Sequence, residues 1–461
     1  MSARRIPGRR RNDTQAPAVE IVPAPSDAVE PFDVGALLEA RGGEAFALHE
    51  RYMNPQMPKV LRTIGFDADY VRAEGAYLFD RDGRRYLDFL AGFGVFALGR
   101  CNPGIEQALR DAMALSLPNL VQMECPPLSG LLAEALVARM PTDSYRCFFT
   151  NSGAESVETV LKYVRCATGR SRVLFADHAF HGLTTGALAL NGAHEFRDRF
   201  GTLLPGCAAV PFGDLDALER ELRDGDVAAF VVEPIQGKGV FVAPDDYLRA
   251  AGELCHRNGA LLAIDEVQTG LGRTGTFFAF EQWNVEPDLV TVAKALSGGY
   301  VPVGAVIAKS AVVEKVFDTM DRAVVHSSTF GQNVLAMTAG LATLHALDAE
   351  SIVEHAKSTG GSLIAGLQAL TDRHELIHEV RGRGLMIGME MVADRKTKEP
   401  LDKTVTRALF HEALERGLVT MSYSHVIRIN PPLVITEDEA LRGVEILDES
   451  FAAIARRFGL G

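Results

Sequence analysis

The sequence predicts an α/β fold: a large domain with a mostly parallel central sheet, followed by a smaller α+β domain. Helical patterns alternate with short apolar runs from about residue 105 to residue 310, which is typical of βαβ units. Runs such as 260–264 (ALLAI) and 289–293 (LVTVA) are continuously apolar and indicate strands buried on both faces. Beyond about residue 335 the pattern is helical, with two later strand candidates at 385–391 and 426–430.

The chain divides into four expected parts. Residues 1–30 are predicted to be a disordered tail, because five arginines precede a stretch rich in proline and alanine. The Arg-rich start also resembles an organelle transit peptide faintly, but it lacks the apolar segment of a secretory signal. Residues 31–90 are expected to form an N-terminal segment packing with the small domain, 91–335 the large domain, and 336–461 the C-terminal small domain.

The N-terminal segment contains two local signals. Residues 33–56 favour a helix that begins at Asp33 as its N-cap and ends before Pro55. A β-hairpin follows, with strands at 77–80 and 85–89 joined by a turn around Asp82 and Gly83.

Composition excludes several classes of protein. The 461 residues carry a net charge of −13, which argues against a general nucleic-acid binder. The six cysteines form no CxxC pair and no metal-ligand spacing, so we expect no metal site and a reduced, cytoplasmic protein. No apolar run reaches the roughly 18 residues that a membrane span needs.

Asp265 and Lys294 each follow one of the buried apolar runs. In open α/β sheets, catalytic groups gather at the carboxyl ends of the strands. A lysine there can form a Schiff base with an aldehyde cofactor, and an aspartate can pair with a pyridinium nitrogen. An ordinary salt bridge between the two is the alternative.

A candidate phosphate site precedes them. The strand pattern at 146–150 leads into a turn of small residues (Asn151, Ser152, Gly153, Ala154) and then into a helix that Gly169 closes. Free backbone N–H groups at such a helix start bind anions, although every doubly wound sheet contains similar turns.

Other strand ends supply further candidates. Phe180 could stack on a planar ring or simply belong to the core, and His181 after it is more typical of a structural histidine. Glu233 brings a carboxylate to the same edge of the sheet. Thr329 carries a hydroxyl suited to phosphate, and Arg381 a guanidinium suited to a carboxylate.

Together these segments resemble the class III aminotransferases, which are fold type I enzymes dependent on pyridoxal phosphate (PLP). The resemblance runs in order from about residue 60 to the C-terminus and is therefore specific. The matching segments are 151–155 (NSGAE), 180–182 (FHG), 233–237 (EPIQG), 265–270 (DEVQTG), 272–275 (GRTG), 293–294 (AK), 328–331 (STFG) and 381–382 (RG).

The resemblance implies a role for each matching residue. Lys294 would carry PLP as a Schiff base and move the proton of the substrate carbon, and Asp265 would keep the pyridine nitrogen protonated. Gln268 would bind the phenolic oxygen of the cofactor. The remaining expected ligands are Ser152, Gly153 and Ala154 at the phosphate, Phe180 and Glu233 at the ring, Thr329 from the neighbouring subunit, and Arg381 at a substrate carboxylate.

One position departs from the family. Ornithine- and 4-aminobutyrate-type relatives have a glutamate two residues after the EPIQ motif, and it pairs with the substrate arginine. Here the residue is Lys238, so we expect Arg381 to stay available for a carboxylate. Phe93 and Phe96, in the apolar run 91–98, would line the opposite wall and favour a long aliphatic substrate.

The sequence therefore predicts a homodimeric PLP-dependent aminotransferase with a shared active site. It would move an amino group between a donor, either a terminal primary amine or glutamate or alanine, and a keto acid or aldehyde. An aminomutase or decarboxylase of the same fold is the nearest alternative. A transcription regulator with an aminotransferase-like domain is disfavoured, because the N-terminal tail is too short for a winged helix.

Overall fold

The computed structural model describes residues 32–421 and 424–460, so the tail predicted for residues 1–30 lies outside the described residues. The chain separates into two compact units, Met1–Val60 and Leu61–Gly461. In the first unit, the Asp33 carboxylate caps α1 (Val34–Arg41) by accepting from the Ala36 backbone N–H. The helix expected over 33–56 is divided there, because η1 (Gly42–Glu44) separates α1 from α2 (Ala45–Tyr52).

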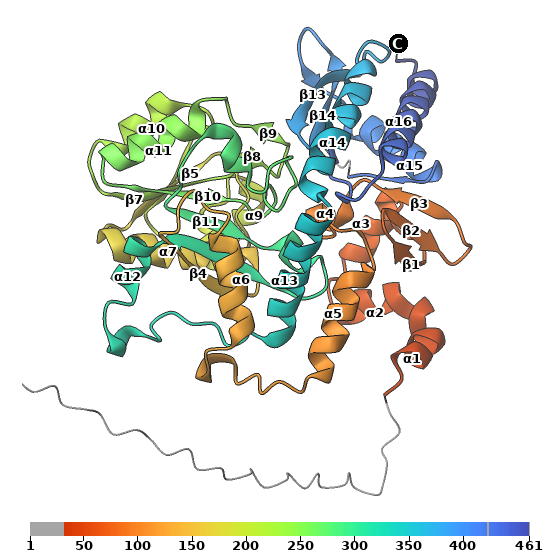
Figure 1. The fold of residues 1–461 in the computed structure, drawn as a ribbon. Coiled ribbons are helices and arrows are strands. Elements are labelled where there is room, and N and C mark those ends of the chain that lie inside the picture. The colour runs from red at the N-terminus through yellow and green to blue at the C-terminus, as the bar shows by residue number, and fades with distance from the viewer. Residues whose placement is uncertain (1–31, 422–423, 461) are drawn as a thin grey trace, which may run out of the picture. The chain divides into compact units, whose positions relative to one another are not determined.

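The centre of the second unit is a seven-stranded sheet, and the predicted fold class is confirmed (Figure 1). β12 runs antiparallel to β11 and to β4, whereas the other neighbouring strands are parallel. In sheet order the strands are β4 (Tyr145–Thr150), β12 (Gly304–Lys309), β11 (Leu289–Val292), β10 (Leu261–Asp265), β7 (Val227–Val232), β5 (Arg172–Ala176) and β6 (Cys207–Val210).

Both faces of this sheet are buried, which is why its strands are continuously apolar. Successive residues of a strand alternate between two core clusters: Leu262 and Ile264 of β10 belong to one, and Ala263 to the other. The first cluster includes α6 (Pro127–Val137), α10 (Leu215–Leu222) and α11 (Tyr247–Arg257). The second includes α7 (Gly153–Thr168), α8 (Thr185–Ala189) and α12 (Ser310–Val316).

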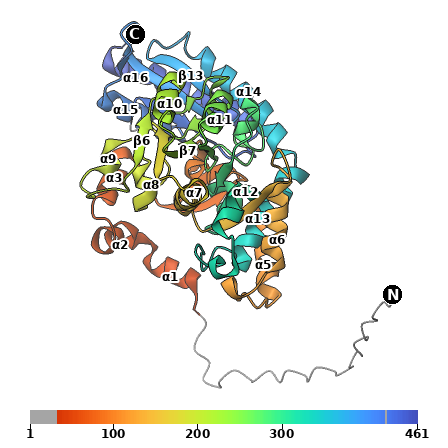
Figure 2. The ribbon, with the colours of Figure 1, turned by 90° about the vertical axis from the view of Figure 1, so that its left-hand side faces the viewer.

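The long helix α13 (Val334–Ala349) follows the large domain and packs against α5 (Pro103–Ala114) and α6, as both views show (Figures 1 and 2). It leads into α14 (Ile352–Ala369), which packs on β13 (Ile377–Arg383) and on α16 (Glu437–Phe458). These blue C-terminal elements lie together in Figure 1.

The C-terminal sheet contains two strands, β13 and β15 (Glu399–Pro400), that the sequence pattern did not reveal. β13 (Ile377–Arg383) includes Arg381, which we expected to precede a strand, and it pairs antiparallel with β14 (Met386–Asp394). β14 also pairs with β17 (Val426–Ile429) and β15 (Glu399–Pro400). α15 (Lys403–Glu415) packs on α16.

The predicted hairpin is present as β2 (Tyr77–Asp80) and β3 (Arg85–Asp88), preceded by β1 (Tyr70–Glu74). β3 pairs in parallel with β16 (Leu418–Val419), so the hairpin shares a sheet with a strand from the C-terminal part of the chain. The domain limits expected from the sequence stay predictions.

The shorter elements are α3 (Met57–Ile64), α4 (Ala91–Gly94), η2 (Val121–Met123), α9 (His194–Arg197), β8 (Ile235–Gln236), β9 (Phe241–Val242), η3 (Ala279–Trp283), η4 (Lys294–Ser297) and η5 (Met320–Arg322).

The helices of the described residues are too short or too polar to cross a bilayer.

Candidate active site

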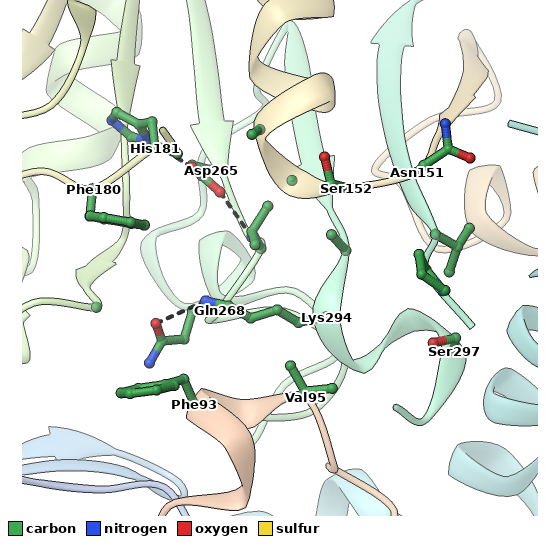
Figure 3. A pocket seen from close by; sticks show the side chains of 18 of the residues that line it. Phe93, Val95, Asn151, Ser152, Phe180, His181, Asp265, Gln268, Lys294 and Ser297 are labelled. Atoms are coloured by element: carbon green, nitrogen blue, oxygen red, sulfur yellow. Dashed lines mark hydrogen bonds and ion pairs between the residues drawn. The ribbon is translucent and has the colours of Figure 1, made fainter. Parts of the chain in front are cut away.

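A cavity of about 690 Å³ opens at the carboxyl ends of β10 and β11 (Figure 3). Buried polar side chains, among them His181, Glu233 and Asp265, form the part of the cavity called here its inner end, and aromatic and aliphatic side chains form much of the remaining wall. The sequence-predicted residues that line it are Phe93, Ser152, Gly153, Ala154, Phe180, Glu233, Asp265, Gln268 and Lys294.

Lys294 lies two residues after the end of β11 and is the first residue of η4. Its backbone has φ of 44°, a left-handed conformation that is costly for a side-chain-bearing residue and often found at functional sites. Its Nζ donates to Oε1 of Gln268 at 3.0 Å (Figure 3). Burial lowers the Lys294 pKa to about 8, so the neutral amine is accessible near physiological pH.

Asp265 ends β10 and is contacted by three hydrogen-bonding groups of its own chain. Its Oδ2 lies 2.7 Å from Nδ1 of His181, while Oδ1 accepts from the Val267 N–H and the Thr291 hydroxyl, each at 3.0 Å. Burial disfavours the charged forms of Asp265 and His181, but their mutual hydrogen bond and opposite charges outweigh this effect. The Asp265 pKa is therefore lowered and the His181 pKa raised. The alternative of a Lys294–Asp265 salt bridge is wrong, since the carboxylate pairs with His181 instead.

His181 was missed as a site residue. The sequence marked it only as the neighbour of Phe180, and a lone histidine after a strand is more often structural. In the structure its ring is buried, it lines the cavity, and its Nε2 has no partner among the described residues.

The first turn of α7 forms an anion-binding cradle. Ser152 caps the helix by accepting from the Glu155 N–H at 3.2 Å, which leaves the Gly153 and Ala154 N–H groups at the cavity wall. A side chain at Gly153 would meet Val267 at 2.9 Å, so only glycine allows this approach. The cradle has the geometry that a phosphate group requires.

Glu233 and Gln268 complete the inner end. Both Glu233 oxygens accept backbone N–H groups, from Gly237 at 2.9 Å and from Phe180 at 3.1 Å, and burial raises the Glu233 pKa. Nε2 of Gln268 is buried without a partner among the described residues. Nε2 of Gln268 is therefore a hydrogen-bond donor without an acceptor among the described residues.

Arg381 corrects the expectation from sequence. It does not line the cavity: its Nη1 is ion-paired with Glu379 at 2.8 Å and with Glu390. The guanidinium also donates to the carbonyls of Val240 at 3.0 Å and Gly239 at 2.8 Å. The prediction that Arg381 stays available throughout is wrong, because two carboxylates from its own sheet take the place of the missing glutamate.

Arg428, which the sequence reading overlooked, does line the cavity. It lies on β17, donates to the Gly237 carbonyl at 3.3 Å, and its guanidinium carbon is 5.0 Å from the centre of the Phe93 ring. In the sequence it is an arginine inside a short apolar strand, and that break in the apolar pattern was the available signal.

The apolar wall is partly as expected. Phe93 lines the cavity together with Val95, but Phe96 does not: its ring lies against the Arg100 guanidinium, 4.1 Å away. Phe196 takes part instead and packs edge-on against Phe180, with 5.4 Å between ring centres. Lys238 also lines the cavity, ion-paired with Glu195.

Thr329 lies outside the cavity lining and is exposed. The preceding Ser328 is tied to the phosphate cradle, because its Oγ accepts from Nδ2 of Asn151 at 2.9 Å. The role of Thr329 in a neighbouring subunit stays a prediction.

Comparison with known proteins agrees with this geometry. Residues 62–451 match the model of the family "Aminotransferase class-III". The chain is 38% identical to the putrescine aminotransferase of Pectobacterium atrosepticum over 90% of this chain and 89% of the relative. It is 40% identical to the acetylornithine aminotransferase of Methanopyrus kandleri, over 84% and 95%. A PLP-bound amine transaminase from an uncultivated Pseudomonas species superposes with a TM-score of 0.78 at 30% identity, covering 84% of this chain and 95% of that one.

Proposed function

The chain belongs to the class-III aminotransferases, and we propose that its cavity transfers an amino group between an amine donor and a keto acid or aldehyde, with PLP as cofactor. The observation that carries this proposal is the buried Lys294 amine in the same cavity as the His181–Asp265 pair and the α7 cradle. A lysine of lowered pKa is a nucleophile suited to an aldehyde.

The residues present fit PLP. The α7 N-terminus suits the phosphate, and the Asp265 carboxylate suits a protonated ring nitrogen because an opposite charge favours the protonated form. The unpaired Nε2 of Gln268 is a ready donor for the phenolic oxygen. Phe180, 37% exposed at the cavity wall, offers an aromatic face for the ring.

When bound, PLP supplies an aldehyde carbon and an electron-accepting ring to the reaction. The chain would supply the proton transfer: Nζ of Lys294 would take the proton from the amine-bearing carbon of the substrate and deliver it to the carbon that had been the aldehyde of the cofactor. Asp265, oriented by His181 and Thr291, keeps its negative charge in a buried site. A fixed charge in such a site needs no reorganisation during the reaction.

Arg428 is the better candidate for the substrate carboxylate. Its guanidinium lies in the same cavity as Lys294, whereas Arg381 is held by Glu379 and Glu390 outside it. Glutamate, alanine or a keto acid would bind there through a charge-assisted contact.

A homodimer with a shared active site is supported by an apolar segment that a single chain leaves exposed. Met113, Leu115, Leu120 and Met123 follow one another along residues 113–123 and are 54–84% exposed. Exposed apolar clusters of this kind mark interfaces. Thr329 would then reach the phosphate of the cofactor that the partner subunit binds. A cytoplasmic location likewise stays a prediction.

Borohydride reduction of the holoenzyme followed by peptide mapping tests the proposal. We expect the pyridoxyl group on Lys294; label on another lysine would contradict the assignment. Product analysis with several amines and pyruvate or 2-oxoglutarate separates the alternatives. A transaminase yields one new amino acid for each amine consumed, a decarboxylase releases carbon dioxide, and an aminomutase isomerises one substrate.

A further inference from the structure

The partly exposed part of the cavity wall around Lys238, called here the rim, carries charged groups that can affect which substrate binds. Lys238 lines the cavity, and its ammonium lies 4.6 Å from the centre of the Phe196 ring. The same ammonium is ion-paired with Glu195 of α9. Phe196 packs in turn on Phe180, so the ion pair holds the aromatic part of the wall in place.

The acidic groups that line the cavity are already occupied. In the part of the chain that the structure describes, these acids are Glu233 and Asp265. Each oxygen of Glu233 accepts a backbone N–H, and Asp265 accepts from His181, Val267 and Thr291. Neither is positioned to serve a second ammonium group of a substrate.

Apart from Lys294 and His181 at the inner end, the basic groups of the lining are Lys238 and Arg428. The only counter-charge at the rim among the described partners of Lys238 is Glu195, whose side chain is 67% exposed. A diamine would bring its distal cation towards a cationic rim without an available acceptor, whereas an apolar or anionic tail would meet no such cost.

We infer that Lys238, held by Glu195, is a specificity-determining residue that selects amine substrates whose distal end is apolar or anionic and excludes diamines. This inference rests on the proposed aminotransferase function and gives its substrate class. The inferred substrate class differs from a diamine, which is the substrate that the name of the putrescine aminotransferase relative gives for that protein.

The test uses matched amines and a series of rim charges. Pentylamine and 1,4-diaminobutane have the same number of heavy atoms and differ in the charge of the distal end; 4-aminobutanoate supplies the anionic tail. Four holoenzymes are compared: Glu195→Gln, wild type, Lys238→Met and Lys238→Glu, in order of increasing negative charge at the rim. Glu253→Gln, on the surface of α11 outside the cavity lining, controls for net charge.

We expect the ratio of kcat/KM for 1,4-diaminobutane to that for pentylamine to be well below one in the wild type. It should fall in Glu195→Gln and rise through Lys238→Met to Lys238→Glu, by about fivefold per unit charge, as for a partly exposed ion pair. The change should appear in KM rather than kcat. The ratio for 4-aminobutanoate should follow the opposite order.

A binding measurement complements the kinetics. Pentanoate, an unreactive analogue, should bind more tightly to Glu195→Gln and more weakly to Lys238→Met than to the wild type, by calorimetric titration. A flat diamine ratio across the series, or a wild-type preference for 1,4-diaminobutane, would overturn the inference while leaving the transaminase intact. Failure of every amine and keto acid would instead overturn the proposed function.

Discussion

The inner end and the rim of the cavity are built differently. At the inner end, Asp265, His181 and Glu233 are buried, and both carboxylates accept hydrogen bonds from neighbouring segments. At the rim, Phe93 and Lys238 are about one-third exposed; Phe93 lies against Arg428, and Lys238 against Glu195 and Phe196. The inner end has the fixed geometry that bond-making chemistry needs, whereas the rim can change its charge and shape without disturbing the fold.

This difference predicts that substitutions at the inner end reduce the rate for every substrate, whereas those at the rim change the rate for some substrates only.

Lys294→Ala should reduce kcat by several orders of magnitude, because both the attacking amine and the proton carrier are lost. Stopped-flow measurement of single turnovers with alanine and with an apolar amine provides the test. Both substrates should lose the same factor; a loss confined to one would mean that Lys294 acts on binding.

Asp265→Asn should slow both half-reactions by about 100-fold or more while the cofactor stays bound, since an amide cannot hold a proton on the ring nitrogen by its charge. Absorbance of the bound cofactor confirms occupancy, and rapid-mixing kinetics give the rates. His181→Gln should have a smaller effect in the same direction, because it loosens the carboxylate without removing it. Near wild-type turnover in Asp265→Asn would refute the assigned role.

Arg428→Gln should raise KM for glutamate or alanine by roughly 30- to 150-fold, the effect of losing about 2–3 kcal/mol of charge-assisted contact. The half-reaction with an apolar amine should be spared. Arg381→Gln is the matched control: it should lower thermal stability, because Glu390 loses its partner, and change KM little. If Arg381→Gln raised KM more than Arg428→Gln, the assignment of the two arginines would be reversed.

The capture of added PLP by the apoprotein should depend on pH through Lys294. Its pKa is depressed from the ordinary lysine value of 10.5 to about 8, so below pH 8 the amine is protonated and unreactive. The rate should rise about tenfold per pH unit up to about 8 and then level off. The same depression implies that the free energy of unfolding of the apoprotein rises with pH between 8 and 10.5, where the unfolded chain binds the extra proton.

Phe93→Ala should raise KM for a long apolar amine by about fivefold, corresponding to the loss of part of one aromatic contact at a partly exposed site. Alanine as donor should be affected less, because it has no aliphatic chain to pack on the Phe93 ring. Phe96→Ala is the comparison: it lies outside the cavity lining, so it should affect stability and leave the KM ratio unchanged.

Much of the inner end was predictable from sequence. A polar residue that directly follows a continuously apolar run is recognisable locally, and parallel strands bring such residues to one edge. Asp265, Lys294 and the turn before α7 were identified in this way, and all of them line the cavity. The N-cap at Asp33 and the hairpin at 77–88 rest on equally local signals.

The two arginines show what the sequence alone left open. Arg381 and Arg428 both pair with Gly388, on opposite sides of β14, so they occupy equivalent positions in the sheet. The carboxylate of Glu390 and the carbonyls of residues 239 and 240 meet Arg381, while Arg428 faces the cavity beside Phe93. No local pattern distinguishes them, because the distinction depends on segments far apart in the chain.

By itself, the sequence determined the α/β class, the edge of the sheet where the chemistry lies and the lysine and aspartate at its centre, since each depends on short-range patterns of apolar and polar residues. Only the tertiary structure decided that His181 supports Asp265, that Arg428 and not Arg381 reaches the cavity, and that Lys238 is balanced by Glu195. These are contacts between distant segments, and the energy of a charged group depends on which partners the fold brings to it.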